Sequence, residues 1–401
     1  MGRQQRISLE EALQRLASAV KPLAALCLPL DAALGRILAE PVVAQMDQPP
    51  FARSPYDGYA LIAADSQGAS RQTPVRLKVV GKSIAGSPAD VSLERGQAVR
   101  IMTGGLIPAG ADCVIMQEQT DCGEQTVEIY QELKARANYC ERGEDFKTGD
   151  VLVTAGLALG AAEYAVLTSA GCVTVKVFPA PRVAVFSTGK ELERVGQPLK
   201  PGQIYDSNSA FMRARLQELR LPLVTAARLD DELDELMRAF AEASQQADLV
   251  ISTGGVSVGE KDLVPEALKR LGAEIVFHGV DIKPGMPAAC AVLNGVPVLA
   301  LSGNPFAAAV TFELLARPVL ARLASDKRLT PRTEQARLAA GFEKARPNRR
   351  FQRGILNDGA VAIPAAQGNG QMLTMVGCNC LVELPAGDAL PAGSSVTVHL
   401  L

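Results

Sequence analysis

The residues of this chain best suited to chemistry follow the apolar run 249–251, where the sequence continues as Ser252-Thr-Gly-Gly-Val-Ser-Val-Gly259. A short apolar run predicts a strand buried on both faces, and Asp262 begins the next helical pattern. The turn between them is therefore expected at the carboxyl end of a parallel strand, where open α/β sheets bind ligands and glycine amides can surround an anion. A tight connection without a ligand is the alternative interpretation, because Glu260 stands where a Walker loop needs Lys and no G-x-G-x-x-G fingerprint is present.

Two further predicted strands end in the same kind of sequence. The run 183–186 is followed by Ser187-Thr-Gly189, and the run 298–301 is followed by Ser302-Gly303. If the three strands are neighbours, their hydroxyls and glycine amides line one edge of the sheet. This shared ending indicates a binding site more strongly than any one of the three turns does.

Charged and polar side chains accompany these turns. Around the predicted sheet they are Glu191, Asp206, Asp230, Asp262, Lys283, Ser302 and Asn304, and in an earlier β-rich region they are Asp57, Thr103 and Asp145. Carboxylates can hold a hard cation such as Mg²⁺, whereas glycine turns and Lys283 can hold a phosphate or another oxyanion. This set of groups suits transfer or hydrolysis at a phosphate ester.

Several other chemistries are disfavoured by composition. With only two histidines, no Ser-His-Asp or Cys-His arrangement can be built convincingly. The eight cysteines form no C-x-x-C pair, so a structural zinc site is not expected. Free thiols and an N-terminus that leads into an amphipathic helix predict a cytoplasmic protein.

Nucleic acid and membrane are not expected as partners. The net charge is -2, aromatic residues are 4% of the chain and Trp is absent, so neither a basic surface nor a stacking platform is indicated. The long chargeless stretch between Lys283 and Glu313 is interrupted by several Gly and Pro residues. It therefore predicts a strand, a turn and a helix in place of a membrane span.

The periodicity of apolar residues predicts the elements that position these groups. Helices are expected over 9–20, which begins with the capping box Ser8/Glu11, and over 161–170, 209–219, 231–243, 264–271 and 306–323. The four helices from residue 209 onward, together with strands over 183–186, 223–226, 249–251, 274–277 and 298–301, form a βαβ series and hence a largely parallel sheet. Short β-like runs between 45 and 145 predict a separate β-rich domain, and the β-like stretch 330–401 predicts a small barrel or sandwich.

Ten short motifs follow one another along nearly the whole chain. They are Tyr56-Asp-Gly-Tyr-Ala60, Arg100-Ile-Met-Thr-Gly104, Val114-Ile-Met-Gln-Glu118, Arg142-Gly-Glu-Asp145, Phe186-Ser-Thr-Gly189, Gly202-Gln-Ile-Tyr-Asp206, Ser252-Thr-Gly-Gly-Val-Ser-Val-Gly259, Ile282-Lys-Pro-Gly285, Gly303-Asn-Pro305 and Phe351-Gln-Arg-Gly354. In this order they resemble the motifs of the MoeA family, the molybdopterin molybdenumtransferases, which are related to the E domain of gephyrin.

The resemblance implies a multidomain α/β plus β fold. The expected parts are a discontinuous N-terminal α/β domain (1–45 plus 146–178), an inserted β-rich domain (46–145), a molybdopterin-binding α/β domain like that of MoaB and MogA (179–327), and a C-terminal β-barrel (328–401). It also implies an elongated homodimer whose active site joins the molybdopterin-binding domain of one subunit to the inserted domain of the other. A molybdopterin adenylyltransferase and molybdoenzyme acceptors are the further partners that it suggests.

The implied activity is insertion of molybdate into adenylylated molybdopterin, with Mg²⁺ and with release of AMP. On this basis the catalytic residues are Asp57, Asp145, Glu191 and Asp262, of which Glu191 and Asp262 hold the metal, and Lys283 and Arg353 bind the oxyanion. The residues expected to bind the pterin and its phosphate are Thr103, Ser187, Thr188, Gly189, Asp206, Ser252, Thr253, Gly254, Gly255, Ser257, Gly259, Ser302, Gly303 and Asn304.

The chain departs from the family's motifs at clustered positions. Where the family has Lys-Pro-Gly-Lys-Pro, this chain has Lys283-Pro-Gly-Met286-Pro. Where the family has Pro-Gly-Asn-Pro-Val-Ser, this chain has Ser302-Gly-Asn-Pro-Phe-Ala307. The family's Gln-Gly-Ser is here Gln367-Gly-Asn369, and its Ser-Thr-Gly-Asp-Glu is here Ser187-Thr-Gly-Lys190-Glu. The positive charge of Lys190 is a candidate replacement for the family's lysine that is missing at Met286. These changes leave open whether molybdate, tungstate or no oxyanion is inserted. A second hypothesis is therefore a catalytically weakened paralogue that binds molybdopterin or a partner protein as a carrier or scaffold.

Overall fold

The structure of the protein is a computed structural model that describes residues 6–256, 263–342, 347–387 and 389–401. The chain divides into two compact units, one formed by residues 1–26 and 177–401 and the other by residues 27–176. The four-domain division expected from the sequence stays a prediction.

The first unit is built around a six-stranded sheet of order β14–β11–β15–β18–β17–β16. Its strands are β11 (Val183–Thr188), β14 (Leu223–Leu229), β15 (Leu249–Thr253), β16 (Glu274–His278), β17 (Ala289–Leu293) and β18 (Val296–Leu301). The pairs β11–β14, β11–β15 and β15–β18 are parallel. The predicted neighbourhood of the three strands with similar endings is thereby confirmed, and their carboxyl ends meet at one edge.

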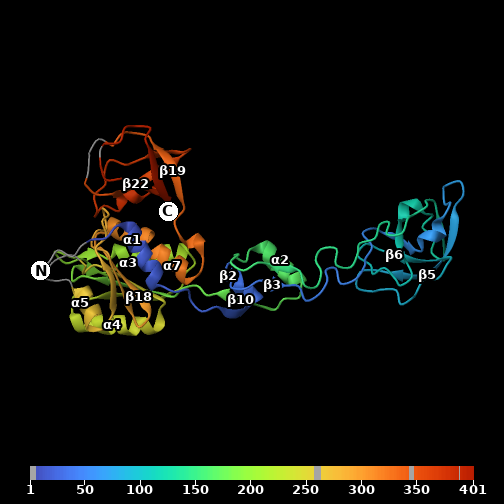
Figure 1. Cartoon of the computed structure of the whole chain (residues 1–401), viewed down its shortest axis with the longest axis horizontal. Coiled ribbons are helices and arrows are strands. Elements are labelled where there is room, and N and C mark those ends of the chain that lie inside the picture. Colours follow the sequence, from blue (N-terminus) through green and yellow to red (C-terminus); the bar gives the residue numbers. More distant parts are fainter. Residues whose placement is uncertain (1–5, 257–262, 343–346, 388) are drawn as a thin grey trace. The chain divides into compact units, whose positions relative to one another are not determined.

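Helices cover both faces of this sheet (Figure 1). Their bounds are α1 (Leu9–Ala19), α3 (Ser207–Glu218), α4 (Leu233–Gln246), α5 (Leu263–Arg270), α6 (Pro305–Thr311) and α7 (Arg317–Leu323). One buried cluster packs α4 and α5 against the sheet, and another packs α1, α3, α6 and α7 against it. The sheet is therefore buried on both faces, as its continuous apolar strands require.

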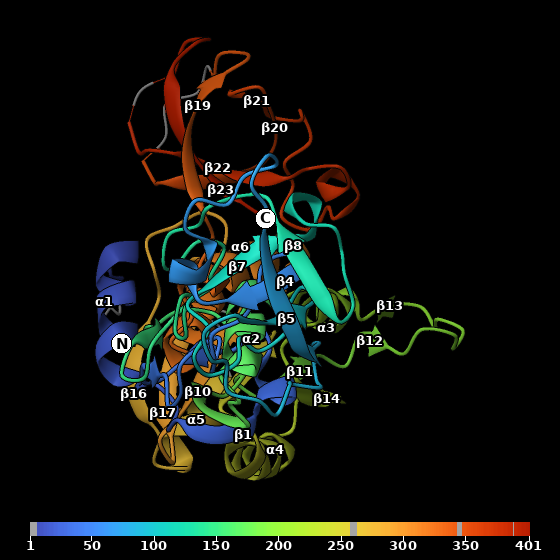
Figure 2. The same cartoon turned by 90° about the vertical axis from the view of Figure 1, so that its right-hand side faces the viewer.

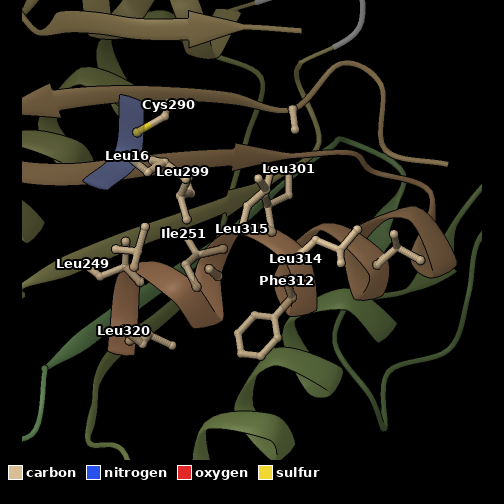
Figure 3. Close-up of a cluster of buried hydrophobic side chains, with 14 of the residues drawn as sticks. Leu16, Leu249, Ile251, Cys290, Leu299, Leu301, Phe312, Leu314, Leu315 and Leu320 are labelled. Atoms are coloured by element: carbon tan, nitrogen blue, oxygen red, sulfur yellow. The ribbon is translucent and has the colours of Figure 1, made fainter. Parts of the chain in front are cut away.

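The larger core lies between the sheet and the helical segment 305–323 (Figure 3). Leu249, Ile251 and Leu299 from β15 and β18 pack with Phe312 and Leu315 there, and all five side chains are fully buried. Each such side chain contributes about 1.5–3 kcal/mol when it leaves water. The predicted single helix over 306–323 contains one π turn at residues 312–316, just before Pro318, which has no N–H for the regular helical ladder.

A closed β-barrel follows the α/β part of the same unit. It consists of β19 (Thr333–Leu338), β20 (Arg350–Asn357), β21 (Ala360–Ala362), β22 (Cys380–Leu384) and β23 (Ser395–Leu400). In Figure 2, as in Figure 1, the barrel lies on the side of the α/β part opposite α4 and α5. A parallel bridge between Lys283 and Arg350 joins the two parts, and Arg349 pairs with Glu10 of α1. The barrel is thus fixed against the segment that precedes β17.

The second unit is mostly β. Its larger sheet has the order β7–β4–β6–β5–β8, formed by β4 (Gly58–Leu61), β5 (Val75–Ser83), β6 (Gln97–Ile101), β7 (Cys113–Met116) and β8 (Thr126–Ile129). Its other strands are β1 (Leu26–Pro29), β2 (Ile37–Leu38), β3 (Val42–Val43), β9 (Val151–Val153) and β10 (Thr174–Phe178), and its α-helix is α2 (Ala161–Ser169). The predicted β-rich character of the region 45–145 is confirmed. In the described part of the chain, no helix is both long and apolar enough to cross a membrane.

Candidate active site

A cavity of about 750 Å³ opens at the edge of the sheet where β11, β15 and β18 end. Its walls come from the strand ends, the small ribbon β12 (Leu192–Glu193) with β13 (Ile204–Tyr205), the start of α3, the segment 283–287, the start of α6 and residues 369–370 of the barrel. The predicted site residues that line it are Thr188, Gly189, Glu191, Asp206, Thr253, Gly254, Gly255, Lys283, Ser302, Gly303 and Asn304. The structure therefore brings together side chains spread over more than a hundred positions of sequence.

The strand ends present hydroxyl groups at two depths. Thr188, Thr253 and Ser302 line the cavity, whereas Ser187 and Ser252 are fully buried. Thr253 Oγ1 donates a hydrogen bond of 3.3 Å to Ser187 Oγ. The two buried serines, expected from the resemblance to bind the pterin, thus lie in the sheet away from the cavity wall, because side chains of successive strand residues alternate between faces.

Gly254 shapes the floor of the cavity at the end of β15. Its φ is +94°, and a Cβ built there would lie 2.4 Å from the Thr188 carbonyl oxygen and 2.8 Å from Thr188 Oγ1. Only glycine fits, since the conformation is left-handed and the two strand ends are already in contact. The glycine-rich sequence after β15 is therefore needed to bring the ends of β11 and β15 this close.

Two polar atoms at the cavity, Thr188 Oγ1 and Asn208 Oδ1, are buried and have no hydrogen-bond partner among the described residues. Asn208 Nδ2, in contrast, donates to the Gly303 carbonyl at 2.8 Å. Buried polar atoms are nearly always hydrogen-bonded in native proteins, so these two atoms mark where a ligand or its water would bind. Sequence reasoning missed Asn208; the only signal was its place in the first turn of α3, directly after the motif that ends at Asp206.

The charges around the cavity are mainly acidic. Among the described lining residues, Glu191, Asp206 and Asp231 carry carboxylates and Lys283 carries the one ammonium group. Asp231 was not among the predicted residues. Asp206 also caps α3, because its Oδ1 accepts from Ser209 N at 3.0 Å. A highly anionic ligand would therefore need additional positive charge here.

Comparison with known protein families gives matches along most of the chain. Residues 7–171 match the MoeA N-terminal region (domains I and II), residues 184–322 match a probable molybdopterin binding domain, and residues 335–401 match the MoeA C-terminal region (domain IV). The chain belongs to the MoeA family.

Relatives of this MoeA-family chain match it over nearly their full length. The molybdopterin molybdenumtransferase of Staphylococcus aureus (strain COL) is 38% identical over 98% of this chain and 95% of its own length. The enzyme of the same name from Staphylococcus epidermidis (strain ATCC 35984) is 36% identical over the same shares. Among solved structures, a molybdopterin biosynthesis MoeA protein from Pyrococcus horikosii has a TM-score of 0.86 at 33% identity and covers 99% of both chains.

Three of the positions where this chain departs from the MoeA motifs lie at the cavity. Met286, Ala307 and Asn369 are lining residues. Lys190, in contrast, forms an ion pair of 3.1 Å with Glu232, and both side chains are more than 60% exposed. The hydrogen bond from Lys190 to Glu232, aided by the charge of that carboxylate, raises the pKa of Lys190. Lys190 is thus engaged outside the cavity and does not replace the charge that a lysine at position 286 would supply there.

Arg353 is placed differently from the role that the resemblance suggests. Its side chain is fully buried, and its Nη1 and Nη2 donate to backbone carbonyls of the barrel segment 366–371. It is not part of the cavity wall. In this structure the guanidinium hydrogen-bonds to the loop whose residues Asn369 and Gly370 line the cavity.

The second unit carries the remaining predicted residues. Asp57 Oδ1 accepts hydrogen bonds from Thr103 N at 2.7 Å and from Thr103 Oγ1 at 2.8 Å. Both bonds lower the pKa of Asp57, and the bond from the backbone N–H has the larger effect. Asp145 is exposed, and its N–H donates to the Gln48 carbonyl at 2.9 Å. Arg53 forms bridges with both Leu106 and Cys140, so the loops that hold Thr103 and Asp145 share one neighbouring segment.

Three predicted residues lie outside the described part of the chain: Ser257, Gly259 and Asp262. Within the described part, no three His, Cys, Asp or Glu side chains gather closely enough to hold a metal ion by themselves. Mg²⁺ does not require such a cluster, because it keeps several waters and binds through one or two carboxylates together with substrate phosphates. Glu191 at the cavity wall fits that mode of binding.

Proposed function

We propose that this MoeA-family chain is a molybdopterin molybdenumtransferase that inserts molybdate into adenylylated molybdopterin and releases AMP. The observation that carries the proposal is the cavity at the sheet edge, which combines glycine amides, strand-end hydroxyls and Lys283 in one place. Glycine amides and hydroxyls suit a phosphate group, and the ammonium group of Lys283 suits an oxyanion. The relatives at 36–38% identity carry the name of the same enzyme.

The reaction is proposed to depend on Mg²⁺. Three carboxylates and one lysine among the described lining residues leave a net negative wall, yet the proposed substrate carries a diphosphate and molybdate is itself an anion. A divalent cation held by Glu191, and by Asp262 as predicted from the sequence, would offset this repulsion and polarise the phosphoryl oxygens when bound. Thr188, Asn208 and Lys283 would orient the substrate.

The test is AMP release from adenylylated molybdopterin by the purified protein. AMP is expected only when both molybdate and Mg²⁺ are present, and EDTA should stop its formation. Adenylylated molybdopterin that remains intact under all four combinations of molybdate and Mg²⁺ would reject the proposal and favour the carrier or scaffold hypothesis.

A homodimer with shared active sites is proposed as well. The cavity is lined by residues of the first unit, whereas Asp57, Thr103 and Asp145 belong to the second, and the family resemblance implies that two subunits complete one site. Light scattering is expected to show a dimer at micromolar concentration. A monomer that retains activity would exclude shared sites.

Mixing two inactive variants tests the shared site directly. In a mixed dimer of Asp57→Asn and Glu191→Gln, one site carries both changes and the other carries neither. Random reassociation should therefore restore about a quarter of wild-type AMP release in a symmetric dimer. If both residues act within one subunit, the mixture stays as inactive as the separate variants.

Met286→Lys is expected to lower the molybdate concentration for half-maximal loading by roughly tenfold, equivalent to about 1.4 kcal/mol. A lysine beside Lys283 would add a charge-assisted hydrogen bond that a thioether cannot make. Molybdate-dependent AMP release measures the effect. The matched control is Lys190→Ala, which should leave the molybdate dependence unchanged because Lys190 pairs with Glu232. Equal molybdate dependence of Met286→Lys and wild type would mean that the oxyanion binds elsewhere.

A further inference from the structure

We infer that Arg353 is a positioning residue, whose buried guanidinium holds the barrel loop 366–374 where Asn369 and Gly370 form one wall of the cavity. The inference rests on the proposed function, since it assigns a role in building that same site. It replaces the direct oxyanion contact that the resemblance suggests for Arg353.

The guanidinium hydrogen-bonds to groups spread along the whole loop. Nη1 donates to the Gln371 carbonyl at 2.8 Å, to the Ala366 carbonyl at 3.4 Å and to Thr374 Oγ1. Nη2 donates to the Gly368 carbonyl at 2.9 Å. The planar, forked geometry of arginine lets one side chain reach acceptors on several turns of a loop at once. This set of bonds closes the loop around the end of Arg353.

The same side chain ties the loop to the α/β part of the unit. The Arg353 guanidinium carbon lies 3.7 Å from the centre of the Phe306 ring, at the start of α6. Phe306 N also donates to the Asn369 carbonyl at 2.9 Å. Asn369 and Gly370 are the barrel residues that line the cavity. A chain of direct contacts therefore runs from Arg353 through the loop and the α6 start to the cavity wall.

Burial argues against a direct role in anion binding. The Arg353 side chain has 0% of its surface exposed, so an oxyanion could reach it only after the loop had moved away. Burial lowers the pKa of Arg353. Its two Nη groups face backbone carbonyls and its guanidinium carbon lies over the Phe306 ring, whereas its Nε is buried without a partner among the described residues. Among the ion pairs of the described residues, none pairs Arg353 with a carboxylate. A buried charge lowers stability unless hydrogen-bond acceptors surround it. The burial of Arg353 therefore depends on the position of the loop, and the loop in turn is held by Arg353.

Amide hydrogen exchange of the substrate-free protein tests the inference. Arg353→Met keeps much of the length and the apolar part of the side chain but removes every donor. It should raise the exchange rates of the amides in 366–376 by at least about tenfold, because four acceptors lose their partner. Arg353→Lys should give a smaller rise, since an ammonium group cannot reach all four acceptors. Unchanged exchange of β22 and β23 would show that the barrel itself stays folded.

Thr374→Val is the second variant, and it removes only one of the acceptors of Arg353, the Thr374 hydroxyl. Thr374 does not line the cavity, so its replacement cannot remove a contact with substrate. We expect a roughly fivefold rise in exchange of the loop amides and a matching rise in the KM for molybdate, with a smaller change in kcat. Thr397→Val is the matched control: it removes a hydroxyl that accepts from Gln335 at 3.0 Å elsewhere in the barrel and should change neither quantity.

The outcomes separate the inference from the proposed function. Loop exchange that stays at the wild-type level in both Arg353→Met and Thr374→Val would overturn the positioning role. A KM for molybdate that rises in Arg353→Met while loop exchange stays unchanged would establish a direct contact instead. If the wild-type protein releases no AMP, the proposed function fails, but the exchange measurement still decides whether Arg353 holds the loop.

Discussion

Gly254→Ala is expected to reduce AMP release more than a hundredfold, which corresponds to a loss of about 2.7 kcal/mol in transition-state stabilisation. The added methyl group would lie 2.4 Å from the Thr188 carbonyl oxygen. Because the clash is with backbone, it cannot be relieved by a side-chain rotation. It would separate the ends of β11 and β15, which carry Thr188 and Thr253 into the cavity.

The strain of placing alanine in a left-handed backbone conformation can be measured separately from the clash with Thr188. Gly295, in the turn between β17 and β18, has a φ of +82°, and a methyl group added there would meet no other atom within 4 Å. Gly295→Ala therefore carries the conformational cost of a left-handed residue, about 1–2 kcal/mol, without a steric clash. It should lower thermal stability slightly and leave kcat/KM near the wild-type value. Equal activities of the two variants would show that the strand ends need not be in contact for catalysis.

Glu191→Gln should abolish Mg²⁺-dependent AMP release, with a reduction of at least about a hundredfold. The change keeps the shape of the side chain and removes the charge that is proposed to hold the cation. Asp262→Asn, which rests on the sequence alone, is expected to act in the same direction. A Mg²⁺ titration of AMP release measures both the maximal rate and the midpoint.

Glu232→Gln is the control for Glu191→Gln. It removes a carboxylate near the same edge of the unit that pairs with Lys190 and does not line the cavity. It should leave the Mg²⁺ titration unchanged. If Glu191→Gln also left the titration unchanged, Glu191 would not hold the cation, and its place beside the Gly189 turn would be structural.

The sequence predicted the edge of the sheet well because its signals are local. Each of β11, β15 and β18 is a continuous apolar run that leads into Ser or Thr followed by Gly, and parallel strands place such endings together. The capping signature of Ser8 and Glu11 located α1: Ser8 is the N-cap, whose Oγ accepts from Glu11 N at 3.0 Å, whereas the Glu11 carboxylate pairs with Arg15. These features depend on neighbours in sequence, so reading them required no three-dimensional information.

Strand β17 was missed for a physical reason. Ala289–Leu293 lies inside a chargeless stretch with no alternation, because it pairs with β16 and β18 and is buried among helices. The turn Asn294-Gly295, with φ of +53° and +82°, is a hairpin signal that could have located it. Its antiparallel pairing is the reason that the sheet is mixed.

The roles of Arg353, Lys190 and Asn208 could not be predicted from sequence. A motif can show that an arginine is present, but whether its guanidinium reaches a cavity or a loop depends on burial, and the structure buries Arg353 completely. The pairing of Lys190 with Glu232 and the contact of Asn208 with the Gly303 carbonyl likewise join distant segments. Such contacts are set by the packing of α3, α4 and the sheet.

The central claim is that AMP release and molybdenum insertion are one reaction at this cavity. The most direct measurement incubates the purified protein with adenylylated molybdopterin, Mg²⁺ and molybdate, and quantifies AMP and metal-loaded cofactor separately. The account predicts equal amounts of AMP and molybdenum-loaded cofactor, and neither product from Glu191→Gln. Cofactor that is bound but neither cleaved nor loaded, or AMP formed without any metal insertion, would contradict it.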